Sequence, residues 1–239
     1  LRKHRDELVE LVGQRTKELQ DSEFKFRLVT ESINDVFWLN TRTADKMLYV
    51  SPAFETLWGM PRQLFDDDPR AFLQAIHPVD RSSLEESFQR FHLQGQAYEC
   101  EYRICRQGAA GEEIRWIHER GFPVPQSTVH GDLMCGVCVD ITERKHLEQQ
   151  ALLSDMLEAM PIPVFSKDRQ GCYLAFNRAF EHFFGTSRRE LIGKSVFDIS
   201  PPELAAVYHQ KDEELFTSGG VQRYESKVKN AGGDMRDVI

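Results

Sequence analysis

The chain has 239 residues, of which 41% are hydrophobic and 28% charged, and its formal net charge is −8. This composition is typical of globular proteins, and a chain of this length is expected to form two domains. Acidic and basic residues are mixed along the whole length. A nucleic-acid-binding domain normally carries a basic patch, so we expect no nucleic-acid partner.

The cell compartment can be predicted from the same sequence. No apolar run approaches the roughly 18 residues of a membrane span, and the charged first residues do not form a secretory signal. The sequence begins without Met and inside a helical pattern, so we interpret it as part of a longer protein. Its five cysteines, an odd number, do not suggest a set of disulfides. We expect a cytoplasmic location, which includes the cytosolic part of a membrane-anchored sensor.

Residues 1–23 predict an exposed amphipathic helix. Leu8, Val12, Leu19 and Phe26 fall on one heptad seam, which polar residues interrupt. The seam fits a coiled coil in a parallel homodimer. The alternative is a solvated helix that packs on its own domain.

An internal repeat at an offset of 126 follows this helix. Ala53–Gly59 recurs as Ala179–Gly185, and Tyr98-Glu99 recurs as Tyr224-Glu225. Several matches in the same order predict two copies of one domain.

Each copy can be interpreted as an α+β unit that begins with a hairpin and a short helix. In the first copy, β-rich runs and turn residues predict strands at 37–39, 47–50, 97–106, 113–122 and 131–139 and helices at 52–58 and 81–94. In the second copy they predict strands at 164–166 and 172–174 and helices at 178–184 and 203–217. Gly59 and Gly185 are expected to end the short helices in a left-handed conformation.

A helix over residues 142–160 is predicted to connect the copies. Asp140 is placed to cap it, with Glu143 reaching back as in a capping box. We expect the junction formed by Asp140, Thr142, Glu143 and Arg144 to relay a signal, because a capped helix transmits rotation where a flexible linker would not.

Cys135 and Cys138 have the spacing of a redox or zinc motif, but they lie in the apolar run 133–139, which predicts a strand. Residues three apart in a strand point to opposite faces, so one metal ion could not readily use both. We expect buried structural cysteines and no metal site.

Five sequence segments together resemble the PAS family, and the resemblance covers nearly everything after residue 24. They are Tyr49–Phe54, Ile76–Arg81, Tyr98–Arg103, Arg115–Ile117 and Asp140–Arg144. The resemblance implies a five-stranded antiparallel sheet of order 2-1-5-4-3 flanked by small helices. It places a first PAS domain at 24–141 and a second at 161–239. Arg236–Ile239 corresponds to Arg115–Ile117, so the second copy is expected to lack its last strand and to have an exposed sheet edge.

The resemblance also implies a function. Such domains sense signals, dimerise and relay to effectors, usually histidine kinases or diguanylate cyclases. No nucleophile–base pair or phosphate-binding loop appears, so we expect no catalytic residue and no enzyme activity in this region. We expect a sensory and relay region that dimerises and couples a stimulus to a downstream effector, most often a histidine kinase in a two-component system. The alternative is a sensor of haem or another small-molecule ligand that regulates a diguanylate cyclase.

Two cofactors can be considered from the resemblance. Blue-light members form a flavin adduct on a cysteine, and the corresponding stretch Pro69–Gln74 contains none, so no cysteinyl-flavin adduct is expected. His209 occupies the place of the proximal histidine of haem-binding members. It is either that ligand or an exposed structural histidine on a polar helix.

Overall fold

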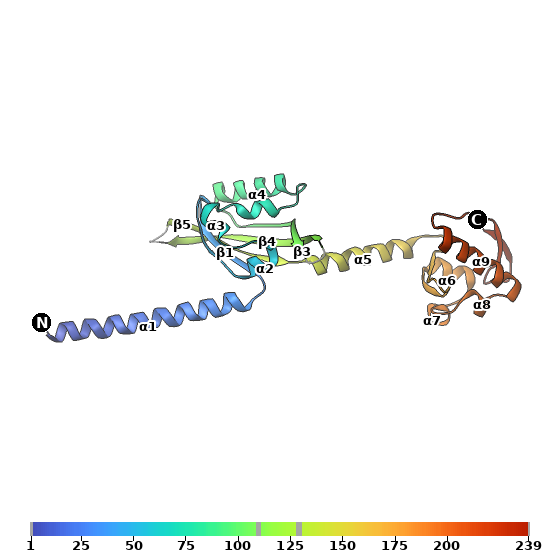
Figure 1. Ribbon diagram of the computed structural model, residues 1–239, viewed down its shortest axis with the longest axis horizontal. Coiled ribbons are helices and arrows are strands. Elements are labelled where there is room, and N and C mark those ends of the chain that lie inside the picture. The colour runs from blue at the N-terminus through green and yellow to red at the C-terminus, as the bar shows by residue number, and fades with distance from the viewer. Residues whose placement is uncertain (1, 109–110, 128–130, 239) are drawn as a thin grey trace. The chain divides into compact units, whose positions relative to one another are not determined.

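The structure, a computed structural model, describes residues 2–108, 111–127 and 131–238. It divides into two compact units, Leu1–His146 and Leu147–Ile239, which Figure 1 shows with their elements labelled. No helix in these described ranges has the length and apolar character needed to cross a membrane.

The first unit contains a long helix, a five-stranded sheet and a set of smaller helices. Its helices are α1 (Arg2–Ser32), α2 (Ala53–Trp58), α3 (Leu64–Asp67), the 3-10 helix η1 (Ala71–Ala75), α4 (Arg81–Gln94) and α5 (Thr142–Ala159), which continues into the second unit. Its strands are β1 (Val36–Thr41), β2 (Met47–Val50), β3 (Tyr98–Gly108), β4 (Gly111–Ser127) and β5 (Gly131–Asp140). The first helix therefore continues past residue 23, where the sequence interpretation ended it.

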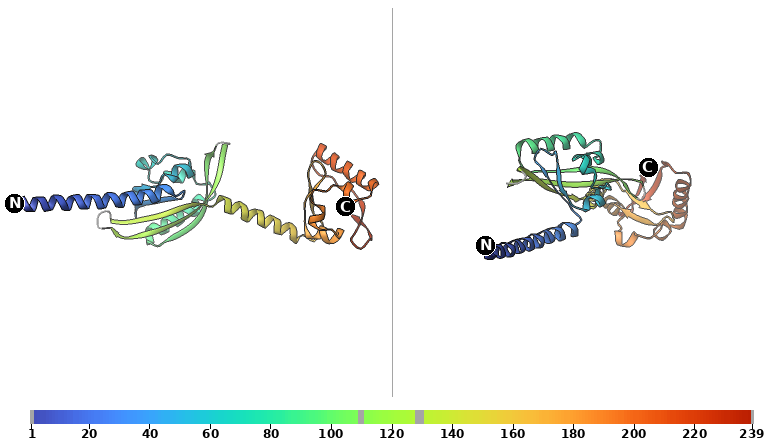
Figure 2. Two further views of the ribbon diagram at one scale, coloured as in Figure 1. Left: turned by 90° about the horizontal axis from the view of Figure 1, so that it is seen from below. Right: turned by 60° about the vertical axis from the view of Figure 1, so that its left-hand side comes forward.

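The predicted α+β fold and its sheet order are confirmed in this unit. The strands pair antiparallel in the order β2-β1-β5-β4-β3. Helix α4 lies across one face of the sheet (Figures 1 and 2). The last strand of the unit, β5, is thus the central one, with β1 on one side and β4 on the other.

Two glycines allow large side chains to lie across the centre of the sheet. Tyr98, Gly121, Gly136 and Trp38 are consecutive partners across β3, β4, β5 and β1. A Cβ atom on Gly121 would lie 2.0 Å from the Tyr98 ring, and one on Gly136 would lie 2.4 Å from the Trp38 ring. Because real Cβ atoms do not approach other atoms so closely, both positions require glycine for the observed packing.

The second unit repeats the elements of this fold from the first hairpin to the second hairpin. It contains the strands β6 (Phe165–Lys167), β7 (Tyr173–Phe176), β8 (Ser226–Lys229) and β9 (Met235–Val238). Its helices are α6 (Arg178–Phe184), α7 (Arg188–Leu191), α8 (Val196–Ile199) and α9 (Pro202–Ser218). As predicted, Gly59 and Gly185 end α2 and α6 in the left-handed conformation, with φ of 69° and 67°.

The repeat extends to hydrogen bonds that the sequence patterns did not reveal. In the first unit Glu55 Oε1 accepts from the Arg62 backbone N–H at 3.1 Å, and the Arg62 side chain donates to the Val50 carbonyl. At the offset of 126, Glu181 Oε1 accepts from the Arg188 N–H at 3.0 Å, and the Arg188 side chain donates to a carbonyl in β7. The same hydrogen-bonded turn therefore follows the short helix in both copies.

In the described residues of the second copy, β6 pairs with β7 and β8 pairs with β9, as two separate two-stranded sheets. By the order of the first unit, the counterpart of β5 would stand between these two hairpins. That the second copy lacks this strand stays a prediction.

The sequence predicts a core that includes Phe37, Trp38, Tyr49, Phe54, Leu57, Trp58, Trp116, Phe165, Phe180 and Phe184, and part of this set is buried. Trp38, Phe54, Leu57, Trp58 and Phe180 are buried as expected. The expectation was wrong for five other aromatic residues: Phe37, Tyr49, Trp116 and Phe184 are half-buried and Phe165 is 48% exposed. In the first unit, strand alternation explains why Phe37 and Trp116 are only half-buried, because their neighbours along the strand point inward instead. In the second unit Phe165 lies on β6, which pairs with β7 alone in the described chain.

The glycine packing makes a direct prediction. Gly136→Ala should lower the free energy of unfolding of the first unit by about 1–3 kcal/mol, because the new methyl group overlaps the Trp38 ring and the Arg120 carbonyl. Urea titration followed by tryptophan fluorescence measures this unit alone, since all three tryptophans lie in it. Gly13→Ala in α1, which meets no atom within 4 Å, is the control. Equal stability of the two variants would contradict the prediction.

Candidate functional site

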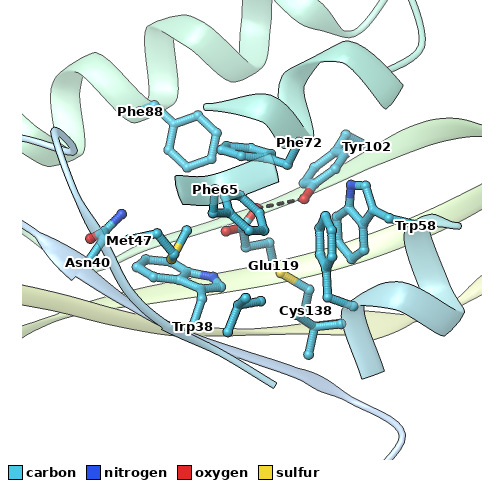
Figure 3. A pocket seen from close by; sticks show the side chains of 13 residues that line it. Trp38, Asn40, Met47, Trp58, Phe65, Phe72, Phe88, Tyr102, Glu119 and Cys138 are labelled. Carbon is cyan, nitrogen blue, oxygen red and sulfur yellow. Dashed lines mark hydrogen bonds between the residues drawn. The ribbon is translucent and has the colours of Figure 1, made fainter. Parts of the chain in front are cut away.

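A small cavity lies inside the first unit, between the sheet and its helices. Its volume is about 40 Å³. Its walls are mostly aromatic rings, contributed by strands and helices that are distant in sequence (Figure 3). The aromatic lining residues are Trp38, Phe54, Trp58, Phe65, Phe72, Phe88 and Tyr102.

One ionisable side chain, Glu119 of β4, reaches into this apolar space. It is 3% exposed. Its two carboxyl oxygens each accept one hydrogen bond, from the Tyr98 hydroxyl at 2.6 Å and from the Tyr102 hydroxyl at 2.8 Å. Burial raises the pKa of Glu119, while the hydrogen bonds from the two tyrosines oppose this shift. Burial and the neighbouring carboxyl group also raise the pKa values of Tyr98 and Tyr102, so both hydroxyls remain donors.

Further polar atoms of the lining lack hydrogen-bond partners. The indole Nε1 atoms of Trp38 and Trp58 and the Oδ1 atom of Asn40 are buried without one. The Trp38 indole faces Glu119 closely enough to lower the pKa of that carboxyl, although it does not reach hydrogen-bond geometry. Unpaired buried polar atoms are costly. The cavity is therefore suited to a small polar molecule that pairs with them.

The cavity wall leads directly into the predicted relay junction. Glu119 is the register partner of Cys138, another lining residue, and Cys138 stands two residues before Asp140 at the end of β5. The Asp140 carboxylate accepts from the Thr142 N–H at 2.9 Å. The Thr142 hydroxyl accepts from the Trp116 N–H, also at 2.9 Å, and so ties the start of α5 to β4.

A second contact holds the first turn of α5 on the sheet. The Glu101 carboxylate of β3 pairs with Arg144 and with Lys145, each at 2.6 Å. The side-chain hydrogen bond of Lys145 is the largest cause of the lowered pKa of Glu101. Of the predicted junction residues, the structure thus brings Asp140, Thr142 and Arg144 into contact with the sheet.

Glu143 does not take its predicted role. It is exposed, and within the described chain it makes no hydrogen bond back to Asp140. The reason is geometric: α5 begins at Thr142, so Asp140 lies one residue before the capping position and Glu143 one residue short of the box position. Thr142 supplies the contact instead.

The last turn of α5 is held by two residues that sequence reasoning missed. Asn177, 3% exposed, donates to the Leu157 carbonyl at 3.0 Å and to the Ile162 carbonyl at 2.9 Å. Glu158 accepts from the Arg178 N–H at 2.9 Å and forms an ion pair with Arg188. The signal was available in the repeat, because Asn177 stands at the position of Ser51, which is also fully buried and bonded to neighbouring backbone.

The predicted dimer seam lies on a mostly uncovered helix. Leu8, Val12 and Leu19 are 60%, 61% and 62% exposed. Phe26 is also 57% exposed, but its ring lies 5.3 Å from the ring of Tyr49, and Thr30 nearby bonds to the same tyrosine. The end of α1 thus packs on its own domain, as the alternative interpretation expected, while Leu8, Val12 and Leu19 are exposed.

His209 lies on α9 and is half-buried. Its Nε2 atom is 3.4 Å from Glu213, and its ring contacts the ring of Phe197 at 5.2 Å. Iron ligation requires Nε2 to face an enclosed apolar space, and here it faces a carboxylate that is 67% exposed. These surroundings do not fit a haem, and haem ligation by His209 stays a prediction without structural support.

The cysteines are free thiols, and only Cys138 of them is buried. No cluster of metal-ligating side chains occurs in the part of the chain that the structure describes. The stretch Pro69–Gln74, which the resemblance placed near the pocket, does contribute Phe72 to the cavity wall.

Two segments match sequence models described as the PAS fold, at residues 47–137 and 151–233. The chain belongs to the PAS fold family. It is also 26% identical over 187 residues to the uncharacterized protein y4lL of Sinorhizobium fredii. The aligned region covers 73% of this chain but only 21% of that protein. The chain therefore spans about a fifth of the length of this relative.

Two solved PAS-type structures illustrate the similarity. A sensory box histidine kinase/response regulator from Burkholderia thailandensis is 26% identical, covers 55% of this chain and 95% of its own, and has a TM-score of 0.40. The N-terminal domain of a diguanylate cyclase with PAS/PAC sensor from Marinobacter aquaeolei is 20% identical, covers 47% of this chain and 99% of its own, and has a TM-score of 0.40.

The buried carboxyl predicts a pH dependence of stability. Because burial raises the folded-state pKa of Glu119, stability is fully present below the ordinary value of about 4.3 and is lost as pH rises through the folded pKa. The loss is about 1.4 kcal/mol for each pH unit between the two values. Glu119→Gln cannot ionise, so its free energy of unfolding should fall less over this range.

Urea titrations at several pH values, followed by tryptophan fluorescence, measure this difference. Glu86→Gln is the matched control, because Glu86 of α4 is exposed and lies outside the cavity lining. It should behave as the wild type does. A parallel decline with pH in all three proteins would show that Glu119 does not titrate as described.

Proposed function

We propose that this chain is a sensory and relay region in which the cavity of the first PAS domain detects a small molecule and α5 carries the response to the second domain. One observation carries the proposal: Glu119 and Cys138 line the cavity on the same two strands that hold the first turn of α5. A change at the cavity wall therefore has a path of two or three residues to that helix.

The wider role is part of the same proposal. PAS sensory domains are generally non-catalytic, and we assign no catalytic residue to this region. The effector is proposed to be a histidine kinase, the common output of the family. We place the chain in the cytoplasm, since its cysteines are free thiols, and propose no nucleic-acid partner.

Amide hydrogen exchange tests the relay. Glu119→Gln should change the exchange rates of amides in the first turn of α5, such as Lys145, as well as those of β4 and β5. Thr142→Val should itself speed exchange in that turn by roughly 5- to 100-fold, because loss of the hydroxyl leaves the half-buried Trp116 N–H unpaired. In the double variant the effect of Glu119→Gln on α5 should shrink.

Thr16→Val is the control for this experiment. The Thr16 hydroxyl bonds only to the Val12 carbonyl of its own helix, so its loss should leave the response of α5 unchanged. The relay proposal fails if Glu119→Gln leaves α5 unchanged, or if its effect is the same with and without the Thr142 hydroxyl.

The proposed parallel homodimer has its own test. Val12→Asp should weaken dimerisation about tenfold or more in multi-angle light scattering, because the seam would bury a charge. Gln14→Asp adds the same charge two residues away, off the seam, and should dimerise as the wild type does. A monomeric mass for the wild type at high micromolar concentration would refute the dimer.

A further inference from the structure

The cavity of the first domain has a chemical character that points to one class of ligand. The inference rests on the proposed sensing role of this cavity. At about 40 Å³ the cavity has room for about three water-sized groups, since one water needs about 10–15 Å³. A ligand enclosed there is therefore small, far below the size of a flavin or a haem.

The polar atoms that face this space include acceptors that lack a donor, while its unpaired donors are the Nε1 atoms of Trp38 and Trp58. A carboxylate offers about four lone-pair sites, and only the Tyr98 and Tyr102 hydroxyls donate to Glu119. The Oδ1 atom of Asn40 is a second buried acceptor without a partner. No lysine, arginine or histidine of the described chain forms an ion pair with Glu119. Glu119 and Asn40 therefore call for a donor, and a positively charged one satisfies Glu119 best.

The walls around Glu119 also favour a cation. Figure 3 shows Glu119 among the side chains of Trp38, Phe65, Phe72 and Tyr102. Aromatic faces attract cations through the ring quadrupole, most strongly where water is excluded, and tryptophan is the best of them. An anion would meet both the carboxyl group and the negative faces of the rings. A neutral alcohol would gain neither the charge pairing with a Glu119 carboxylate nor the attraction of a cation to the rings.

We propose that this cavity binds a small organic cation, a primary ammonium group on a short carbon chain, whose N–H groups donate to Glu119 while its carbon atoms lie against the aromatic rings. Binding is coupled to a proton. In the empty cavity burial favours the protonated carboxyl, and the arriving cation favours the carboxylate. A proton that Glu119 holds in the empty cavity is therefore released to solvent as the ammonium ion binds.

Ethylammonium chloride is the probe for the test, titrated into the 239-residue chain and followed by tryptophan fluorescence and calorimetry. A ligand of three non-hydrogen atoms reaches a Kd no tighter than about 0.5 mM, so the titration extends to about 50 mM. Ethanol is the neutral isostere, propionate the anion, and potassium chloride the control for ionic strength. Phosphate and cacodylate buffers contain no amine and differ in ionisation enthalpy, so they reveal the released proton.

We expect ethylammonium to bind, ethanol, propionate and potassium to bind at least about tenfold more weakly, and the heat to differ between the buffers by up to roughly one proton. Glu119→Gln should weaken ethylammonium binding by at least about tenfold and abolish the buffer dependence. Glu86→Gln should bind as the wild type does. The Glu119→Gln side chain has the same shape as the original and leaves Tyr98 and Tyr102 unchanged. The unfolding curve of this variant shows whether it is folded.

Two outcomes overturn the inference: no ethylammonium binding by the wild type, or equal binding by Glu119→Gln. If ethanol or propionate binds better than ethylammonium, the cation inference fails while the cavity stands as the sensing site. If ethylammonium binds through Glu119 but leaves hydrogen exchange in α5 unchanged, the inference holds and the relay proposal fails. The two proposals are thus tested separately.

Discussion

The buried carboxyl group of Glu119, held between the hydroxyls of Tyr98 and Tyr102, is the interaction on which the rest of the first domain depends. A carboxyl group in an aromatic interior is unfavourable unless its oxygens are paired, so the two tyrosines must stand where they do. Tyr98 can lie over the sheet only because Gly121 has no side chain there. In the same row across the sheet, Gly136 likewise has no side chain where the Trp38 ring lies. Because Gly121 and Gly136 have no Cβ atoms, the large side chains lie over the centre of the sheet. The cavity is the space left between these side chains.

The order of the strands connects this interior to the helix that follows. β5 is last in sequence but central in the sheet, so the strand that leads into α5 has the cavity wall on it and neighbours on both sides. Trp116 and Asp140 then fix the first turn of α5 through Thr142. At the other end of α5, Asn177 and Glu158 fix the last turn to the second unit. A helix held at both ends can pass on a displacement that a flexible linker would absorb.

The sequence was a good guide to the elements and a poorer one to the site. Alternating β-rich runs, the repeat at Gly59 and Gly185, and the family resemblance together predicted the strands and their order. Burial was predicted less well, because Trp116 looks like a core residue in sequence, whereas in the fold it lies beside Arg103 and Lys145 on the outer face. Glu119 was missed altogether. An acidic residue in the strand sequence His118-Glu119-Arg120 gives no sign of burial, which arises only when Tyr98 and Tyr102 from another strand close over it.

The same limit applies to the helix ends. A capping box at Asp140 and Glu143 was a sound expectation from spacing, but a shift of the helix start by one residue gave the role to Thr142. Asn177 was visible only as the counterpart of Ser51 in the repeat, and its contact with the Leu157 carbonyl requires the chain to return on itself after α5. Local pattern predicts elements, while side-chain roles depend on which elements meet.

Infrared difference spectroscopy on the protonation of Glu119 tests the central claim most directly. A protonated carboxylic acid has a carbonyl stretch that is absent from a carboxylate and separated from the amide bands. The wild type minus Glu119→Gln spectrum should keep this band above about pH 5, where an ordinary glutamate is already ionised, and the band should vanish as pH rises further. A spectrum without the band at that pH would show an ionised Glu119 and would contradict the account.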